Sequence, residues 1–283
     1  MEFKIASERV LICKEQFTLK EAEAKAWSKK LEAFGTLDKF TSFLSRPKEE
    51  DFELIYQEHR YQPFWHVASK AHYVYDRDSH YQFEVTGHEV GTVTLEGKNF
   101  PVTNGHLHVP VIEHCQEDLA EELLMDGVSG EKKPSLKEYL NKAVIEVKGK
   151  DIKKSLKKDD IVVPPQTRIS AIMREMLAHM IQGIQADKIF EEQVEVTYVD
   201  LYYRPIYAFQ YRWKSKNKEA ILEFDGITGA TQTGSRTFNE YLGKVLDIDF
   251  LFDLGADAAG IFLPGGSIAV KVAKKYLDKK TKK

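Results

Sequence analysis

The sequence predicts an α+β protein of two related units, each a helix followed by an antiparallel sheet, with a helical tail. Two observations predict this: helices expected at residues 18–34 and 167–189 each precede alternating, turn-rich segments, and those segments contain similar strands. The expected divisions are N-terminal helices (1–48), a β-rich first unit (49–127), a lysine-rich connector (128–166), a helix-plus-sheet second unit (167–235) and a helical, small-residue-rich tail (236–283).

Local signals define the first half of the chain. Thr18 and Glu21 form a capping box at the start of the first helix, and Gly35 ends it. A short helix is expected at 37–44. The block that follows alternates apolar and polar residues, with hairpin turns predicted at 76–79 and 96–99 and a helix at 116–127.

The second half begins with an amphipathic helix. Its apolar stripe consists of Ile169, Ile172, Met176, Met180 and Ile184, widened by Met173, Leu177 and Ile181. This spacing is typical of a helix packed on a core, and we prefer that interpretation to a cofactor site. Strands are predicted at about 193–199, 203–213 and 218–225.

Residues 49–67 align with residues 191–209 without a gap. The identical pairs are Glu49/Glu191, Glu50/Glu192, Glu53/Glu195, Tyr56/Tyr198, Tyr61/Tyr203 and Pro63/Pro205. The alignment indicates an internal duplication, the alternative being chance similarity between two amphipathic strands.

Each aligned strand contains a proline flanked by aromatic residues. Because proline lacks a ladder donor, these strands are expected to begin beside the proline or to run along a sheet edge. An exposed edge can accept an extended segment of a partner. The predicted binding residues are Tyr61, Pro63, Trp65, Tyr203, Pro205 and Tyr207.

The segment at 167–232 resembles a PepSY-type unit. The resemblance rests on a helix, an aromatic strand, a hairpin and the closing sequence EFDGITG (223–229), which contains an Asp-x-x-Thr-Gly turn. The first aligned strand is not followed by an Asp-x-x-Thr-Gly turn. The resemblance implies an inhibitory or regulatory binding role rather than catalysis.

Two patterns raise an enzymatic alternative. His106, His108 and His114 share the parity of one strand and are a candidate zinc site, although a polar strand face explains the same alternation. Glu146 and Lys148, with Asp126 as a partner carboxylate, resemble part of a magnesium-dependent nuclease site. The alternative function is therefore a metal-dependent hydrolase or nuclease.

The C-terminal segment is basic. In a helix beginning after Ser267, Lys271, Lys274, Lys275 and Tyr276 are expected to contact an anionic membrane surface or a partner, the alternative being a helix packed on its own domain. The net charge of −3 gives no reason to expect nucleic-acid binding. The two cysteines and the charged N-terminus favour a cytoplasmic location, with membrane-surface association as an option.

The leading prediction is a binding or regulatory protein. The sequence favours a protein without enzymatic activity over an enzyme. It is expected to use sheet edges or the groove between the duplicated units. Its partner would be a protein or peptide segment, and the protein itself could be an oligomer. No cofactor is expected under this prediction, whereas the alternative function requires zinc.

Overall fold

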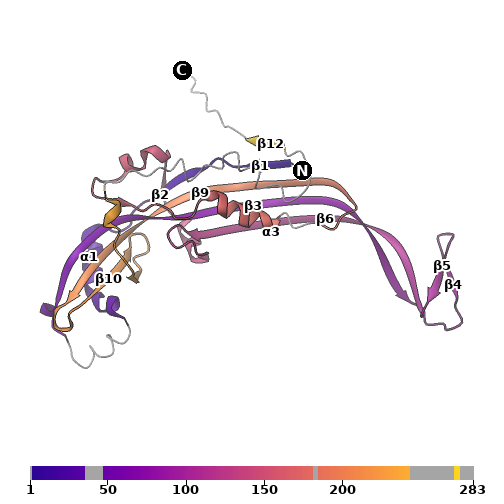
Figure 1. Cartoon of the computed structure of the whole chain (residues 1–283), viewed down its shortest axis with the longest axis horizontal. Coiled ribbons are helices and arrows are strands. Elements are labelled where there is room, and N and C mark those ends of the chain that lie inside the picture. Colours follow the sequence, from indigo (N-terminus) through magenta and orange to yellow (C-terminus); the bar gives the residue numbers. More distant parts are fainter. Residues whose placement is uncertain (1, 36–46, 181–183, 243–270, 275–283) are drawn as a thin grey trace, which may run out of the picture.

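One large mixed β-sheet forms the body of the protein. The computed structural model describes residues 2–35, 47–180, 184–242 and 271–274. Figure 1 shows long strands that curve together along the molecule, with a narrow ribbon extending at one end. The expected α+β class is therefore wrong, because the two predicted units share a single mixed sheet and do not form separate helix-plus-sheet units.

Three long strands dominate the described residues. The strands are β1 (Glu2–Ile5), β2 (Arg9–Cys13), β3 (Phe52–Glu84), β4 (Thr92–Leu95), β5 (Lys98–Thr103), β6 (His106–Asp126), β7 (Val144–Val147), β8 (Ile161–Val162), β9 (Lys188–Trp213), β10 (Lys218–Asp225), β11 (Thr231–Gly234) and β12 (Lys271–Lys274). The helices are α1 (Leu19–Ser28), α3 (Ile169–Met180) and the 3-10 helices η1 (Lys30–Phe34), η2 (Glu49–Asp51), η3 (Pro134–Tyr139), η4 (Gly149–Ser155), η5 (Lys214–Lys216) and η6 (Asn239–Tyr241).

The sheet is centred on the antiparallel pair β3 and β9. Its main path runs β11-β10-β9-β3-β6-β5-β4. Along its other side β9 pairs in succession with β1 and β2, both parallel, and with β10, which is antiparallel. β7 extends the sheet beyond β2, and β8 pairs with β3 in parallel. On this path the strands of the predicted second unit, β9 to β11, lie side by side, as do those of the predicted first unit, β3 to β6, and the two sets join at β3 and β9 into one sheet.

Several local predictions were wrong in an informative way. Residues 116–126 continue the strand β6 instead of forming a helix, and residues 76–79 lie inside β3 instead of in a turn. Residues 271–274 form a strand that pairs with β1, where the sequence predicts a helix. In each case pairing with a distant strand outweighs the local signal. The helix expected at 37–44 lies outside the described residues.

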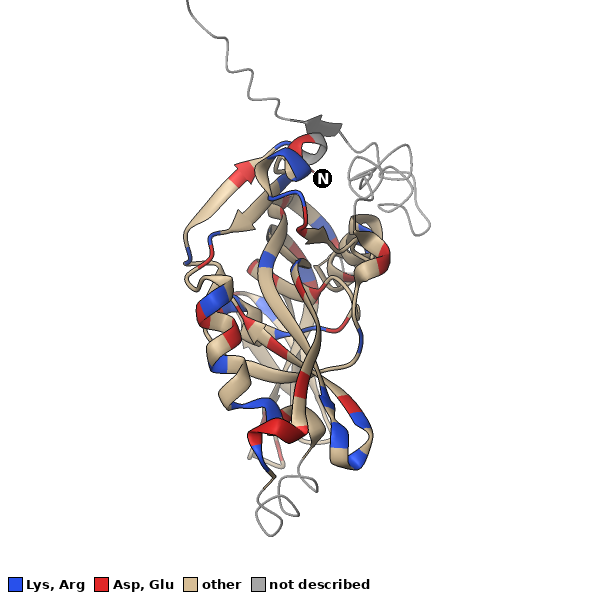
Figure 2. Ribbon diagram, turned by 90° about the vertical axis from the view of Figure 1, so that its left-hand side faces the viewer, with Lys and Arg blue, Asp and Glu red and all other residues tan. Residues whose placement is uncertain are grey.

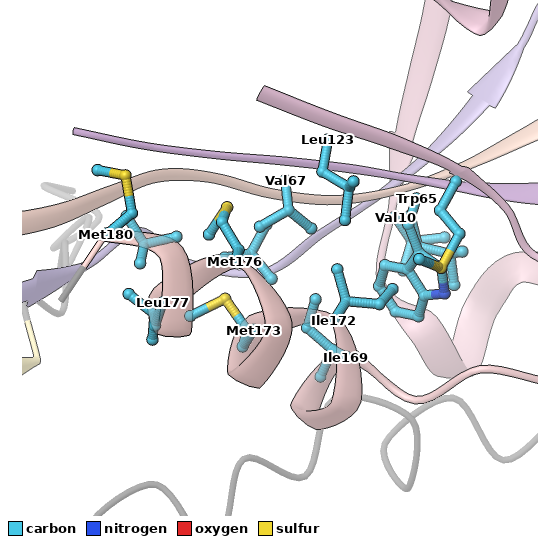
Figure 3. Close-up of a cluster of buried hydrophobic side chains, with 14 of the residues drawn as sticks. Val10, Trp65, Val67, Leu123, Ile169, Ile172, Met173, Met176, Leu177 and Met180 are labelled. Carbon is cyan, nitrogen blue, oxygen red and sulfur yellow. The ribbon is translucent and has the colours of Figure 1, made fainter. Parts of the chain in front are cut away.

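Other predictions are confirmed. Thr18 and Glu21 form the capping box of α1, and Gly35 follows η1 with a φ of 89°. The turn at 96–99 joins β4 to β5. The stripe residues from Ile169 to Met180 lie in α3 and are buried, and Figure 3 shows isoleucine and methionine side chains of this helix facing Trp65, Val67 and Leu123 of the sheet. The helix was predicted to continue to residue 189, but Ile184 follows it and is half-buried, and β9 begins at Lys188.

The helices α1 and α3 cover the same face of the central pair β3 and β9. The odd-numbered residues Tyr61, Trp65, Leu201 and Tyr203 pack in the cluster that contains α3. Further along β9, Tyr207, Phe209 and Tyr211 pack on Ala22 and Ala26 of α1. Because side chains alternate along a strand, the even-numbered residues point to the opposite face between Tyr56 and Ala68 of β3 and between Tyr198 and Gln210 of β9. Register shifts change this alternation beyond these bounds.

Charged residues of both signs are distributed over the strands and helices (Figure 2). No helix within the described ranges combines the length and the apolar character that a bilayer crossing requires.

Candidate functional site

The two aligned proline strands pair with each other in the middle of the sheet. Tyr61 lies opposite Pro205, and Pro63 lies opposite Tyr203, so that Gln62 faces Arg204 between them. Exchanging one strand for the other reproduces this arrangement, which places a local pseudo-two-fold axis at the Gln62–Arg204 pair. The expectation of two edge strands was therefore wrong, because β3 and β9 are the most central strands of the sheet.

The prolines mark the points where the hairpin ladders end. The N–H of Gly127 donates to the carbonyl oxygen of Pro63 at 2.9 Å, and the N–H of Gly226 donates to that of Pro205 at the same distance. Proline has no N–H with which to return the bond.

The carbonyl of each turn glycine instead binds the segment that leads into a helix. Gly127 accepts from the N–H of Gln166, before α3, at 2.7 Å, and Gly226 accepts from that of Gln16, before α1, at 2.8 Å. Each proline thereby leaves an acceptor that holds a helix entry in place.

Two matching turns follow the hairpins. The sequence Asp126-Gly-Val-Ser-Gly130 closes the first hairpin, and Asp225-Gly-Ile-Thr-Gly229 closes the second. In the first turn the Asp126 carboxylate accepts from the N–H groups of Val128 and Ser129 at 2.9 and 3.0 Å. In the second, Asp225 accepts from Ile227 and Thr228 at 2.9 and 2.8 Å. The first turn was not predicted, because Ser129 stands where the motif has threonine.

On the odd-numbered face of the sheet, two aromatic side chains also bind the segments that lead into the helices. The indole N–H of Trp65 donates to the carbonyl oxygen of Thr167 at 3.0 Å, and the hydroxyl of Tyr207 donates to that of Phe17 at 2.9 Å. Trp65 and Tyr207 are an aligned pair, and each accepting residue comes just before a helix. The same set of contacts therefore occurs twice, around turns, prolines and helix entries.

A cavity of about 710 Å³ lies on the pseudo-two-fold axis, on the even-numbered face of the sheet. Part of its lining consists of pairs of residues at equivalent positions of the two halves. These pairs are Gln62 with Arg204, Asp126 with Asp225, Ser129 with Thr228, Lys133 with Gln232, and Tyr139 with Phe238. We call it the axial cavity. Its lining shows that both hairpins and the segments after them contribute to one site.

Arg204 organises the floor of the axial cavity. Its guanidinium donates to the Tyr139 hydroxyl at 3.2 Å and to the Gln62 side-chain oxygen at 3.3 Å, and lies 3.5 Å from the Asp225 carboxylate. The Tyr139 hydroxyl in turn donates to Asp225 at 2.5 Å. Burial disfavours the charged guanidinium, but Tyr139 and Asp225 raise the pKa of Arg204. Arg204 thus stays cationic at neutral pH.

The other buried acids of the cavity also have partners. Burial opposes ionisation of Asp126, but the Ser129 N–H and the Lys133 ammonium outweigh it and lower the pKa of that carboxyl. Lys133 lies 2.9 Å from Asp126. Glu223 accepts from the buried Arg60 guanidinium and, at 2.7 Å, from the Gln232 amide. These bonds fix the floor side chains, a common property of preorganised sites.

The mouth of the cavity carries the less constrained charges. Arg236 and Glu138 line the cavity and are exposed, and neither forms an ion pair with any residue in the described part of the chain. The guanidinium of Arg236 lies 4.6 Å from the centre of the Phe238 ring. A ligand can therefore meet one cation and one anion at the entrance and fixed hydrogen-bonding groups below.

The predicted binding residues lie close to this cavity but face away from it. Tyr61, Trp65, Tyr203 and Tyr207 are buried on the odd-numbered face. Pro63 and Pro205 alternate with Gln62 and Arg204, and they position the turn glycines. The sequence thus identified the two strands that meet at the site, whereas the residues that line it are their immediate neighbours.

The structure does not bring the three predicted zinc ligands together. All three lie on β6, where the His106 ring donates to the Asn104 carbonyl oxygen at 2.9 Å and His114 contacts Asp76 at 2.6 Å. A strand rises about 3.3 Å per residue, so His108 and His114 are roughly 20 Å apart along it. Among the described residues there is no group of three or more side chains suited to hold a metal ion.

The nuclease-like residues are also separated. Glu146 of β7 pairs with Leu11, Leu11 with Tyr202, Tyr202 with Phe64, and Phe64 with Asp126, all in one row across the sheet. At about 4.8 Å between neighbouring strands, Glu146 and Asp126 lie roughly 19 Å apart. They cannot share one magnesium ion. Of the predicted tail contacts, Lys271 and Lys274 lie in β12, and Lys275 and Tyr276 lie outside the described residues.

No family model, curated protein or solved structure matches the chain.

Proposed function

We propose that the protein is a non-enzymatic binding or regulatory protein whose ligand occupies the axial cavity. The observation that carries this proposal is the paired lining of one cavity by both hairpins, which corresponds to the groove expected between duplicated segments. An ancestral duplication is part of the proposal, supported by the repeated contacts of the turns, prolines and helix entries.

The lining indicates a small polar ligand or the end of a peptide. Gln62, Ser129 and Gln232 offer donors and acceptors, while Arg236 and Glu138 suit groups of opposite charge. The buried floor acids are neutralised by Lys133, Arg204 and Arg60, so they are not poised to act on a substrate. A cytoplasmic location belongs to the proposal and is supported by two cysteines that are both free.

The test is an NMR titration of the purified protein with amino acids, dipeptides and dicarboxylic acids. The expected result is saturable shifts at the side chains of Gln62 and Gln232, abolished in a Gln62→Leu variant. A Lys70→Gln variant, which alters a shallow depression elsewhere on the sheet, is the matched control and should bind normally. Shifts confined to residues outside the cavity would overturn the proposal.

A further inference from the structure

The outer edge of β6 is a long margin of the sheet (Figure 1). On its inner side β6 pairs with β3 in an unbroken register from His106 to Asp126. On its outer side it pairs with β5 only at His106 and Leu107, and with Lys132 through a single bridge at Met125. Between residues 108 and 123, no other described strand pairs with this edge.

The direction of the backbone groups follows from the ends of the strand. The N–H of Asp126 donates to Glu131 and the carbonyl of Leu124 accepts from Lys133, both at 2.8 Å and both away from β3. Because the register is unbroken and pairs alternate, every even-numbered residue back to His108 directs its N–H and carbonyl outward. Pro110 occupies one of these outward positions, where a missing donor does not disturb pairing with β3.

The equivalent edge of the second hairpin is occupied. There β11 pairs with β10 from Phe224↔Thr231 to Ile221↔Gly234. In the first hairpin, the bridge between Met125 and Lys132 is equivalent to the first pair of β10 and β11. The chain then leaves this edge, because η3 begins at Pro134. The position taken by β11 in one hairpin is therefore unfilled by described residues in the other.

The charge of this edge distinguishes between possible occupants. Residues 108–123 contain no lysine or arginine, and their acidic residues are Glu113, Glu117, Asp118, Glu121 and Glu122. A second copy of β6 would place acidic residues opposite acidic residues, which destabilises a sheet pair. A basic strand would be attracted. Glu117 forms no ion pair with another described residue. Asp118 and Glu122 are exposed, with His72 at 2.6 Å and Lys137 at 2.5 Å as their respective partners.

We propose that the outer edge of β6, from His108 to Leu123, accepts an extended lysine- and arginine-rich segment of a partner protein as an added strand. The outward N–H and carbonyl groups provide the main-chain hydrogen bonds, and the acidic side chains select a basic segment. This site is separate from the axial cavity and does not depend on the function proposed for it.

The experiment uses three fluorescent decapeptides and the full chain. One alternates lysine and valine, the second has the same sequence with N-methyl groups on alternate residues, and the third alternates glutamate and valine. We expect only the first to bind, more weakly as salt rises, and to slow amide exchange between residues 108 and 122. N-methylation should weaken binding at least tenfold, because it removes the N–H donors along one side of the extended peptide without changing its charge.

Matched variants test the strand itself. Ala120→Pro removes one outward N–H and should weaken binding of the lysine–valine peptide at least tenfold, whereas Ala120→Thr keeps the N–H and should bind normally. If the N-methylated peptide bound equally well, charge alone would explain the binding of the lysine–valine peptide, and the proposal would be overturned. It is also overturned if no peptide binds at low salt, or if the chain self-associates through this edge instead. The peptide comparison remains decisive if Ala120→Pro does not fold.

Discussion

Gly127 lies so close to Pro63 that a Cβ atom at position 127 would be 2.8 Å from the Pro63 carbonyl oxygen. The hydrogen bond between the same two residues leaves neither backbone free to move away. We therefore expect Gly127→Ala to lower the free energy of unfolding by about 1–3 kcal/mol, the range typical of overpacking. Chemical denaturation followed by circular dichroism would measure this change.

Two other glycines provide controls for that prediction. At Gly226 the added Cβ would lie 3.1 Å from the Pro205 carbonyl oxygen, so Gly226→Ala should be destabilising to a smaller degree. At Gly91 it would meet nothing within 4 Å, and Gly91→Ala should change stability little. Equal stability of the variants at 127 and 91 would contradict the close contact at Pro63.

The equivalence of Trp65 and Tyr207 gives a second prediction. Each donates a hydrogen bond to the carbonyl of a residue just before a helix. Trp65→Phe and Tyr207→Phe should each cost about 1–3 kcal/mol, because a partly buried carbonyl oxygen loses its donor and, at Tyr207, the contact with Glu15 is lost as well. The measurement is hydrogen exchange of the amides in α3 for the first variant and in α1 for the second. Faster exchange in the other helix only would contradict these pairings.

The sequence predicted local features well where local chemistry decides them. The Thr18–Glu21 capping box, the apolar stripe of α3 and the turn between β4 and β5 each depend on neighbouring residues, and all three are confirmed. A helix was predicted at 116–127, but residues 116–126 belong to the strand β6. Its pairing with β3, which is distant in sequence, decides the outcome.

The candidate site was only partly predictable for the same reason. The alignment of Tyr61–Pro63 with Tyr203–Pro205 identified the right strands, but nothing local shows that they pair with each other. The rule that proline marks an edge failed because each proline lies at the end of a hairpin ladder in a central strand. The Asp126 turn was readable from the sequence once serine is allowed in place of threonine.

Cys13 gives a third prediction. Burial raises the pKa of its thiol to about 12, and the side chain is almost fully enclosed. Because the thiolate is the reactive form, iodoacetamide at pH 8 should modify Cys13 far more slowly in the folded protein than in denaturant. Mass spectrometry of tryptic peptides would follow this, with Cys115 as the internal comparison. Rapid modification of Cys13 under native conditions would show that this part of the core opens readily.

The ion pair of Asp126 and Lys133 predicts a dependence of stability on pH. The folded protein lowers the pKa of Asp126 from its ordinary value of 3.8. A carboxyl with a lowered pKa stabilises the folded state above its unfolded pKa, and that contribution is lost as the pH falls through the folded pKa. The effect should therefore be complete above about pH 5 and should disappear in more acidic solution.

Asp126→Asn isolates this contribution, because the amide oxygen can still accept from the N–H groups of Val128 and Ser129. At pH 7 the variant should be less stable by about 1 kcal/mol, a small value because Lys133 is partly exposed and screened by solvent. At pH 3 and below, the difference between the two proteins should shrink toward zero. Denaturation curves at pH 7, 5 and 3 measure it, with Lys133→Gln as a second variant that should match. A difference that stays constant across this range would mean that the turn is stabilised by hydrogen bonding alone, without the charge of Asp126.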